Sequence, residues 1–374
     1  MRLSRVAGRL LHSPVFSPIL PASADAASRC WRCGRYRAAR GGTAPPRARL
    51  AAVHGWQRGS RSATAHDMMT TGDAALRLGI DLGGSKIELV ALDECGKVLL
   101  RRRRPTPRGS YRETVAAVGK LVAAAERELG QRGSVGVGIP GAESAVDGTV
   151  KNANSTWLIA HALRDDLQTL LQREVRLAND ANCFALSEAT DGAAEGAETV
   201  FGVILGTGVG GGIVVRQRVL EGANRIAGEW GHNPLPLPDE EILPPPPCYC
   251  GRCGCIETWL SGPALAADHL RHGGEALIAP QIASRASHGD TACEATLQRY
   301  ERRLAKALAM VVNILDPDAI VLGGGLSNID RLYRSVPQLW RRYIFSDVVQ
   351  TRLLRNSHGD SSGVRGAAWL WNAA

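Results

Sequence analysis

The sequence predicts a duplicated α/β fold in two halves with a cleft between them, and three observations support this prediction. Residues 77–105 read as strand, tight turn, strand, turn and strand. Residues 199–222 repeat the pattern of strand, glycine-rich turn and strand about 120 residues later. Residues 318–325 form a further apolar strand that follows a helix and ends in three glycines. A repeat of this kind indicates two related halves that bind a ligand between them.

The first hairpin is defined by where its glycines fall. An alternating apolar strand runs up to Asp81, Gly83 and Gly84 mark a tight turn, and a second strand starts at Ile87. A P-loop or a dinucleotide-binding motif would lead into a helix instead, so both motifs are disfavoured. We therefore expect a hairpin loop that runs from Asp81 to Lys86.

The second hairpin and the third strand carry the same kind of glycine-rich end. Glycines let backbone amides approach a phosphate chain closely, and clusters of such amides bind anions. A carboxylate at the strand end, Asp81, is suited to hold a hydrated Mg²⁺. The residues predicted to bind a nucleotide and its Mg²⁺ are Gly79, Ile80, Asp81, Leu82, Gly83, Gly84, Ser85 and Lys86 in the first hairpin, Gly206, Thr207, Gly208, Val209, Gly210, Gly211, Gly212 and Ile213 in the second, and Gly323, Gly324 and Gly325 after the third strand.

An apolar strand over residues 175–178 ends at Asn179 and Asp180, and a helix follows. Strand ends in an open α/β sheet face the ligand crevice, where a carboxylate can take a proton from a reacting hydroxyl. An aspartate just before a helix is also a common N-cap. The pattern alone leaves both roles open for Asp180.

Residues 248–255 read CYCGRCGC, with four cysteines in eight positions. Disulfides, a redox pair and a metal site are the alternatives. Cys248 and Cys250 are too close in sequence for an easy disulfide. His232 precedes Cys248 by 16 positions, and one histidine with three cysteines completes a tetrahedral Zn²⁺ site.

The net positive charge comes entirely from the start of the chain. Residues 1–75 hold twelve arginines, no lysine and three aspartates, which accounts for the whole formal net charge of +9. The neutral remainder gives no electrostatic reason to expect a nucleic-acid partner. It also has no apolar run of about 18 residues, so no membrane partner or span is expected.

Residues 1–75 are rich in arginine, alanine, glycine, serine and proline, and show no helix or strand period, which predicts a disordered leader. Two interpretations fit this composition. The leader is an organelle transit peptide, or the start is over-extended and translation begins at Met68 or Met69. The second interpretation predicts a cytoplasmic protein, and the first predicts an organellar one.

Several strings in the chain resemble one known family. GIDLGGSK, VKNANSTWL, EVRLANDANC, GEWGHNPLP, CYCG..GCIET and HGDSSGVRGAAWLW are similar to motifs of the ROK family of sugar kinases and repressors, which has an actin-like, ribonuclease H-like duplicated ATPase fold. The similarity runs from about Leu76 to Trp371 and is strongest to the bacterial fructokinases, also called mannokinases. Ser85 stands where the family usually has threonine, so the hydroxyl is retained.

The resemblance implies ATP-dependent phosphorylation of a hexose, with D-fructose converted to D-fructose 6-phosphate. Kinases for N-acetylglucosamine, glucose or mannose are the alternatives. A ROK-type repressor is less favoured, because the leader shows no recognition-helix period. The resemblance implies Asp180 as catalytic base, and sugar contacts from Asn154, Asn179, Glu229, His232 and Glu257.

The resemblance also assigns the metal ligands. They are His232, Cys248, Cys250 and Cys255, which leaves Cys253 as a surplus thiol. Four protein ligands close the site, so the zinc is expected to be structural. If one ring nitrogen of His232 binds zinc, the other is available to a sugar hydroxyl.

The expected organisation has an N-terminal α/β domain over residues 76–196 and a C-terminal α/β domain over residues 197–360. The second domain would contain a zinc loop over residues 232–257. A last helix within residues 361–374 is expected to pack back on the first domain. A homodimer is possible.

Overall fold

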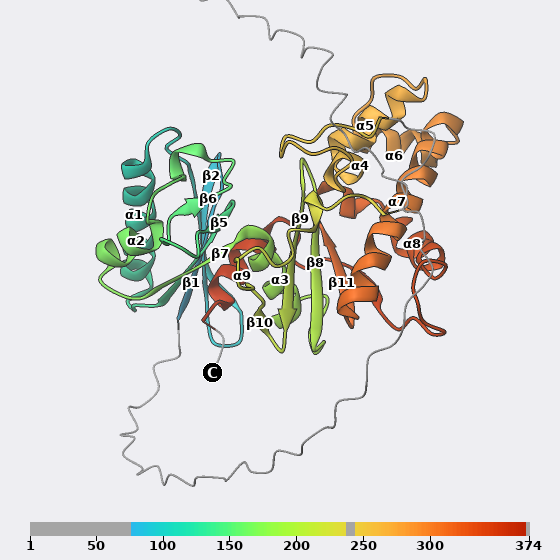
Figure 1. Cartoon of the computed structure of the whole chain (residues 1–374). Coiled ribbons are helices and arrows are strands. Elements are labelled where there is room, and N and C mark those ends of the chain that lie inside the picture. Colours follow the sequence, from blue (N-terminus) through green and yellow to red (C-terminus); the bar gives the residue numbers. More distant parts are fainter. Residues whose placement is uncertain (1–75, 237–243, 372–374) are drawn as a thin grey trace, which may run out of the picture. The chain divides into compact units, whose positions relative to one another are not determined.

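The computed structural model describes residues 76–236 and 244–371 (Figure 1). The predictions for the leader, and for residues 237–243 of the zinc loop, lie outside the described residues. In the part of the chain that is described, no helix is both long enough and apolar enough to cross a membrane.

The first sheet has five strands in the order β3-β2-β1-β4-β7. Its strands are β1 (Arg77–Leu82), β2 (Lys86–Leu92), β3 (Val98–Pro105), β4 (Ser134–Ile139) and β7 (Val175–Asn179). The first three strands are antiparallel neighbours, whereas β4 and β7 run parallel to β1. The predicted succession of strand, turn and strand over residues 77–105 is therefore confirmed.

The second sheet has the order β10-β9-β8-β11-β12 and repeats the first. Its strands are β8 (Thr199–Leu205), β9 (Val209–Val215), β10 (Arg218–Val219), β11 (Ala319–Gly323) and β12 (Arg352–Arg355). Again the first three strands are antiparallel, and the last two run parallel to β8. Two sheets with the same strand order and directions show that the fold is duplicated. The division into domains at residue 196 stays a prediction.

Helices and short segments surround these sheets. The small third sheet pairs β5 (Ala142–Glu143) with β6 (Val150–Lys151). The α-helices are α1 (Tyr111–Leu129), α2 (Leu163–Leu171), α3 (Asp180–Thr190), α4 (Glu257–Leu260), α5 (Gly262–Arg271), α6 (Ala279–Ser287), α7 (Thr291–Leu315), α8 (Leu332–Trp340) and α9 (Ser362–Trp369). The 3₁₀ turns are η2 (Thr156–Leu158), η3 (Trp230–His232), η4 (Gly325–Asn328) and η5 (Gly359–Ser361).

Three apolar clusters form the core of the described residues. One joins β1, β2 and β4 to α1 and α2, which lie together on one face of the first sheet (Figure 1). A second joins β8 and β11 to α5, α7 and α8. The third contains residues of α3 and α9 together with Val90 of β2 and Val321 of β11. Because this third cluster draws on both sheets, α3 and α9 hold the two sheets together.

Helix α9 lies directly on the first sheet because glycines leave room for it. A Cβ atom on Gly79 of β1 would lie 2.1 Å from the carbonyl oxygen of Val364, and one on Gly136 of β4 would lie 1.9 Å from that of Ala367. The end of the chain therefore packs against the strand with which the described residues begin. Gly79 was predicted to bind ATP. In the structure its lack of a side chain is needed for this packing.

Candidate functional site

Two carboxylates lie where β1 ends and α3 begins. Burial raises the pKa of Asp81 to about 6, and the nearby charges of Asp180 and Glu88 add to that shift. Asp180 keeps solvent access, but the protein atoms around it remove enough water to raise its pKa to about 6 as well. Paired acids with raised pKa values are a common feature of catalytic sites.

The N-cap of α3 is Asn179. Its side-chain oxygen accepts from the Ala181 N–H at 2.9 Å, and its amide donates to the Gly141 carbonyl at 2.8 Å. A carboxylate oxygen of Asp180 shares the same Ala181 N–H at 2.8 Å. The helix therefore has its cap without Asp180, so the capping alternative for Asp180 is wrong. Asn179 was predicted to bind sugar. In the structure both its side-chain oxygen and its side-chain NH₂ group are hydrogen-bonded to the backbone.

The first glycine tip is shorter than predicted. Asp81 is still in β1, where it lies opposite Glu88 in the register with β2, and Lys86 already belongs to β2. The tip itself is Gly83–Ser85. The Thr106 hydroxyl donates to the Gly83 carbonyl at 2.7 Å, and Arg108 donates to the Gly84 carbonyl at 3.0 Å. These supports from beyond β3 follow only from the folded chain, so the sequence did not reveal them.

The second tip is also shorter than predicted, because β9 starts at Val209. The Gly206 N–H donates to the Gly208 carbonyl at 3.0 Å and closes the turn. Gly210, Gly211, Gly212 and Ile213 are strand residues. A Cβ atom on Gly212 would lie 2.6 Å from the Ala181 carbonyl oxygen, so this glycine admits α3 rather than a phosphate.

The third glycine cluster lies beside the second tip. Gly323 ends β11, and Gly324 has a φ of +77°. A Cβ atom on Gly324 would lie 2.5 Å from the carbonyl oxygen of Leu205, the residue just before the second tip. Glycine is therefore required for this strand end to approach the tip closely.

A buried tryptophan positions two of the predicted sugar ligands. The indole N–H of Trp230 donates to the Gly210 carbonyl at 3.0 Å, and its ring meets Phe201 edge-on. A Cβ atom on Gly231 would lie 2.1 Å from the Val209 carbonyl oxygen. Glu229 and His232, on either side of this pair, are thus held against the start of β9.

The predicted sugar ligands come together in part. Burial raises the pKa of Glu229, with Glu257 adding to the rise and His232 opposing it, and Glu229 in turn raises the pKa of Asp180. One oxygen of Glu257 accepts from the Val209 N–H at 2.9 Å, so Glu257 also supports the second tip. Asn154 is exposed in the loop before η2, and no described contact joins it to the others.

The four predicted metal ligands do meet. The donor atoms of His232, Cys248, Cys250 and Cys255 all lie within 4.8 Å of one another. The Cys250 and Cys255 sulfurs are 3.6 Å apart, and Cys248 Sγ lies 3.6 Å from His232 Nδ1. A tetrahedron with Zn–S bonds of about 2.3 Å has edges of about 3.8 Å, so this donor set fits zinc in both chemistry and spacing.

Two residues that stand between the cysteine ligands in the sequence, Tyr249 and Cys253, do not belong to the four donors. Cys253 is exposed and is not part of the group of four donors, in line with its place as the surplus cysteine. The Tyr249 hydroxyl lies 2.9 Å from His232 Nε2, and the two rings meet at an interplanar angle of 89°. Sequence reasoning missed Tyr249, although its place between two cysteine ligands was a usable signal.

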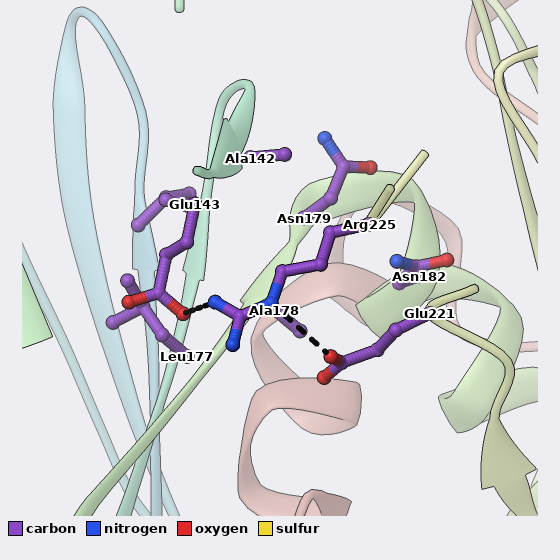
Figure 2. Close-up of a pocket in the computed structure, with 9 residues that line it drawn as sticks. Ala142, Glu143, Leu177, Ala178, Asn179, Asn182, Glu221 and Arg225 are labelled. Carbon is purple, nitrogen blue, oxygen red and sulfur yellow. Dashed lines mark hydrogen bonds and ion pairs between the residues drawn. The ribbon is translucent and has the colours of Figure 1, made fainter. Parts of the chain in front are cut away.

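A second feature that sequence reasoning missed lies beside Asn179. A small cavity of about 30 Å³ is lined by Asn179, Asn182 and three charged side chains. The charged side chains are Glu143, Glu221 and Arg225, which are drawn in Figure 2. Arg225 lies 3.5 Å from the Glu143 carboxylate and 3.9 Å from that of Glu221. These ion pairs tie the segment that leads to Glu229 to β5.

Comparison with known proteins gives consistent matches. Residues 77–374 match the family model of the ROK family. The N-acetyl-D-glucosamine kinase of Yersinia pseudotuberculosis serotype O:1b is 41% identical over 296 residues, which are 78% of this chain and 97% of that protein. The crystal structure of a ROK hexokinase from Thermus thermophilus has a TM-score of 0.70 and 31% identity, over 79% of this chain and 97% of that one.

A second solved structure carries ligands. The ROK family glucokinase from Streptomyces griseus, in complex with glucose and AMPPNP, has a TM-score of 0.62 and 27% identity, over 79% of this chain and 98% of that one. Together with the repeated strand order, these similarities confirm the predicted fold class.

Proposed function

The chain belongs to the ROK family, and we propose that it transfers the γ-phosphoryl group of ATP to the 6-hydroxyl of a hexose. The observation that supports this most strongly is the placement of Asp81 and Asp180. Both carboxylates have a pKa raised to about 6, and the charge of Asp180 adds to the rise at Asp81, beside a glycine tip at the end of β1. Similarity to sugar kinases over most of the chain supports the same proposal.

ATP would lie with its phosphates against the backbone amides of the two tips, Gly83–Ser85 and Gly206–Gly208. The support of these tips by Thr106, Arg108 and Glu257 keeps the amides in place before ATP arrives. Asp81 would hold a hydrated Mg²⁺, which supplies positive charge against the phosphates.

Asp180 would act as the general base. With a pKa of about 6, its carboxyl group is mostly ionised at neutral pH and still basic enough to accept a proton. As the 6-hydroxyl oxygen bonds to the γ-phosphorus, its proton passes to Asp180. The bond from the γ-phosphorus to the bridging oxygen breaks, and ADP leaves with that oxygen.

The hexose would be held by side chains that surround Asp180. Glu229 and His232 flank the anchored Trp230, and Glu257 has one carboxylate oxygen left beside its bond to Val209. Asn154 and Asn179 are the remaining proposed contacts. Several polar partners are needed because a hexose presents vicinal hydroxyls.

We also propose a structural zinc in the cluster of His232 with the three cysteines. All four positions of a tetrahedral site would be taken by protein, so zinc would supply no open position for chemistry. Its contribution would be to fix the loop that joins His232 to Glu257. The fit of the donor spacing to a zinc tetrahedron supports this proposal.

D-fructose is the acceptor we propose first. The strings KNANSTW and GHNPLP support it by their resemblance to the fructokinase branch alone. N-acetyl-D-glucosamine is the second candidate, because kinases of that name share 41% identity with this chain.

A coupled assay of ADP release tests the function and the acceptor together. The purified full chain would be assayed with ATP, Mg²⁺ and D-fructose, D-mannose, D-glucose or N-acetyl-D-glucosamine, and kcat/KM compared. The highest value is expected for D-fructose. A preference for N-acetyl-D-glucosamine would replace the acceptor and keep the reaction, whereas no hexose-dependent ADP release would contradict the proposed function.

A further inference from the structure

The segment between β10 and η3 is fastened to the small sheet of β5 and β6 by two polar contacts. The Arg225 guanidinium lies 3.5 Å from the Glu143 carboxylate of β5. The Lys151 ammonium group of β6 donates to the Asn224 carbonyl at 3.2 Å. Two adjacent residues of the segment are therefore bound to both strands of one small sheet, although more than 70 residues separate the partners in the sequence.

Glu143 is a buried carboxylate that needs cationic partners. Its side chain is only 7% exposed, and Arg164 of α2 also pairs with it. Burial of a carboxylate is costly unless charges or hydrogen bonds compensate for the lost water. Figure 2 shows the Arg225 side chain between the carboxylates of Glu143 and Glu221, with its guanidinium directed to Glu143. The pairing therefore gives the segment a defined anchor point.

The backbone carries this anchor onward to Glu229. Arg225 has a φ of +54°, in the left-handed region that glycine adopts at lower cost, and its N–H closes a turn on the Gly222 carbonyl at 3.2 Å. The next turn follows at once, because the Glu229 N–H donates to the Ile226 carbonyl at 3.2 Å. Since the two turns are consecutive, the position of Arg225 determines where Glu229 lies.

The small sheet that receives Arg225 adjoins other proposed sugar contacts. Asn179 donates to the carbonyl of Gly141, the residue just before β5, at 2.8 Å. Asn154 follows the end of β6 by three residues. Asn179 also lines the cavity that Arg225 and Glu143 line. Proposed sugar contacts from before residue 196 are therefore attached to the same sheet that holds Arg225.

We propose that Arg225 is a positioning residue of the hexose site, which acts through its ion pair with Glu143. The pair keeps Glu229 at a fixed spacing from Asn179 and Asn154. This inference rests on the proposed hexose kinase function. Arg225 itself would touch neither the sugar nor the phosphates. It would hold sugar-binding groups from two parts of the chain in one arrangement before the hexose arrives, so that binding does not have to order them.

Loss of this tether should affect the hexose and not ATP. The two tips proposed to hold ATP have supports of their own, which are Thr106 and Arg108 for the first tip and Glu257 for the second. Groups that bind the sugar equally in the ground state and the transition state contribute to KM and leave kcat unchanged. A rise in the KM for hexose alone is therefore the signature of a positioning role.

The variant Arg225→Ala removes the cation and keeps Cβ, so the left-handed backbone is as strained as in the wild type. The matched control is Arg216→Ala. Arg216 also has a positive φ, of +50°, and its guanidinium pairs with Glu198 at 2.6 Å. It follows β9 at the end away from the second tip. Both variants therefore lose one arginine and one ion pair with a glutamate.

The full chain would be measured by coupled ADP release, with hexose and ATP varied in turn, and by thermal melting. For Arg225→Ala we expect the KM of the preferred hexose to rise about three- to tenfold. Its kcat and its KM for ATP should stay within about twofold of the wild type. Arg225→Lys keeps the charge and should recover part of the loss. Arg216→Ala should match the wild type in its kinetics, and the two alanine variants should melt alike.

A double-variant comparison tests the partner. Glu143→Gln should also raise the KM for hexose, and adding Arg225→Ala should change it little further, because the two side chains form one tether. Additive effects would contradict that tether. If Glu143→Gln does not fold because Arg164 loses its buried partner, the comparison of Arg225→Ala with Arg225→Lys and Arg216→Ala still decides.

Other results would overturn the proposal. An unchanged KM for hexose in Arg225→Ala, or an equal rise in Arg216→Ala, would show that Arg225 does not position the site. Equal rises in the KM for hexose and for ATP, with a lower melting temperature, would assign Arg225 to general stability. In either case a wild type that phosphorylates hexoses leaves the proposed function standing, whereas a wild type that phosphorylates no hexose removes both.

Discussion

At the start of α3, two neighbouring side chains share one backbone N–H. Asn179 caps the helix through that N–H, and Asp180 accepts from it with one of its two carboxylate oxygens. The helix end does not depend on the charge of Asp180. The charge is therefore available for chemistry, while the protein atoms around this carboxyl group remove enough water to raise its pKa.

The cysteines allow a matched test at the same scale. The wild type is expected to bind about one zinc per chain. Cys250→Ser should lose the metal, because a serine hydroxyl is a much poorer ligand than a thiolate, and the KM for hexose should rise more than the KM for ATP. Cys253→Ser should keep both metal and activity, because Cys253 lies outside the group of four donors.

Elemental analysis and steady-state kinetics on the two variants check this prediction. Loss of zinc from both variants would show that the ligand set is misassigned. A wild type that contains no zinc would contradict the metal site as a whole.

The sequence alone predicts the roles of some of these residues and not of others. The spacing of the cysteines and the resemblance to a family were enough to predict the four donors that the structure brings together. The place of Tyr249 on His232 depends on how the loop folds, which spacing does not encode. The same is true of Arg225, whose partners Glu143 and Glu221 come from different segments.

At the scale of elements, the alternation of apolar residues was sufficient to locate both hairpins, but not their ends. The runs Asp81–Lys86 and Gly206–Ile213 looked like loops because they are rich in glycine. In the structure many of these glycines are strand residues that let a neighbouring backbone approach, as Gly212 does for α3. A single sequence does not distinguish a glycine that is required for close packing from a glycine that is required for a turn.

Helix α9 offers a matched pair of glycines for testing that reasoning. A Cβ atom on Gly366 would lie 1.6 Å from the carbonyl oxygen of Cys183 in α3, whereas Gly363 has nothing within 4 Å. We expect Gly366→Ala to lower the free energy of unfolding by about 3 kcal/mol or more, because two backbones must move apart. Gly363→Ala should leave it unchanged or raise it by up to about 1 kcal/mol.

Urea denaturation of the two variants, followed by circular dichroism, provides the measurement. Equal stability of Gly366→Ala and Gly363→Ala would contradict the close contact between α9 and α3.

At the scale of the whole molecule, duplication places equivalent hairpins in two sheets. Each sheet has an antiparallel hairpin with a glycine tip followed by two parallel strands, and the third apolar cluster joins α3 and α9 to strands of both sheets. The repeat was visible in the sequence because hairpins are local. The joining of the last helix to the first strand was predicted only by resemblance to a family, since it connects residues far apart in the chain.

The central claim is that Asp180 takes the proton from the hexose hydroxyl during phosphoryl transfer. The most direct test is the pH dependence of kcat/KM for the preferred hexose in the wild type and in Asp180→Asn. The wild-type value should fall as the pH drops below about 6, because protonation removes the base. Asp180→Asn should lower kcat by about 10²- to 10⁴-fold and lose this pH step. Its melting temperature should stay close to that of the wild type, because Asn179 still caps α3. A variant whose kcat stays within a few-fold of the wild type, with the same fall below pH 6, would contradict the claim.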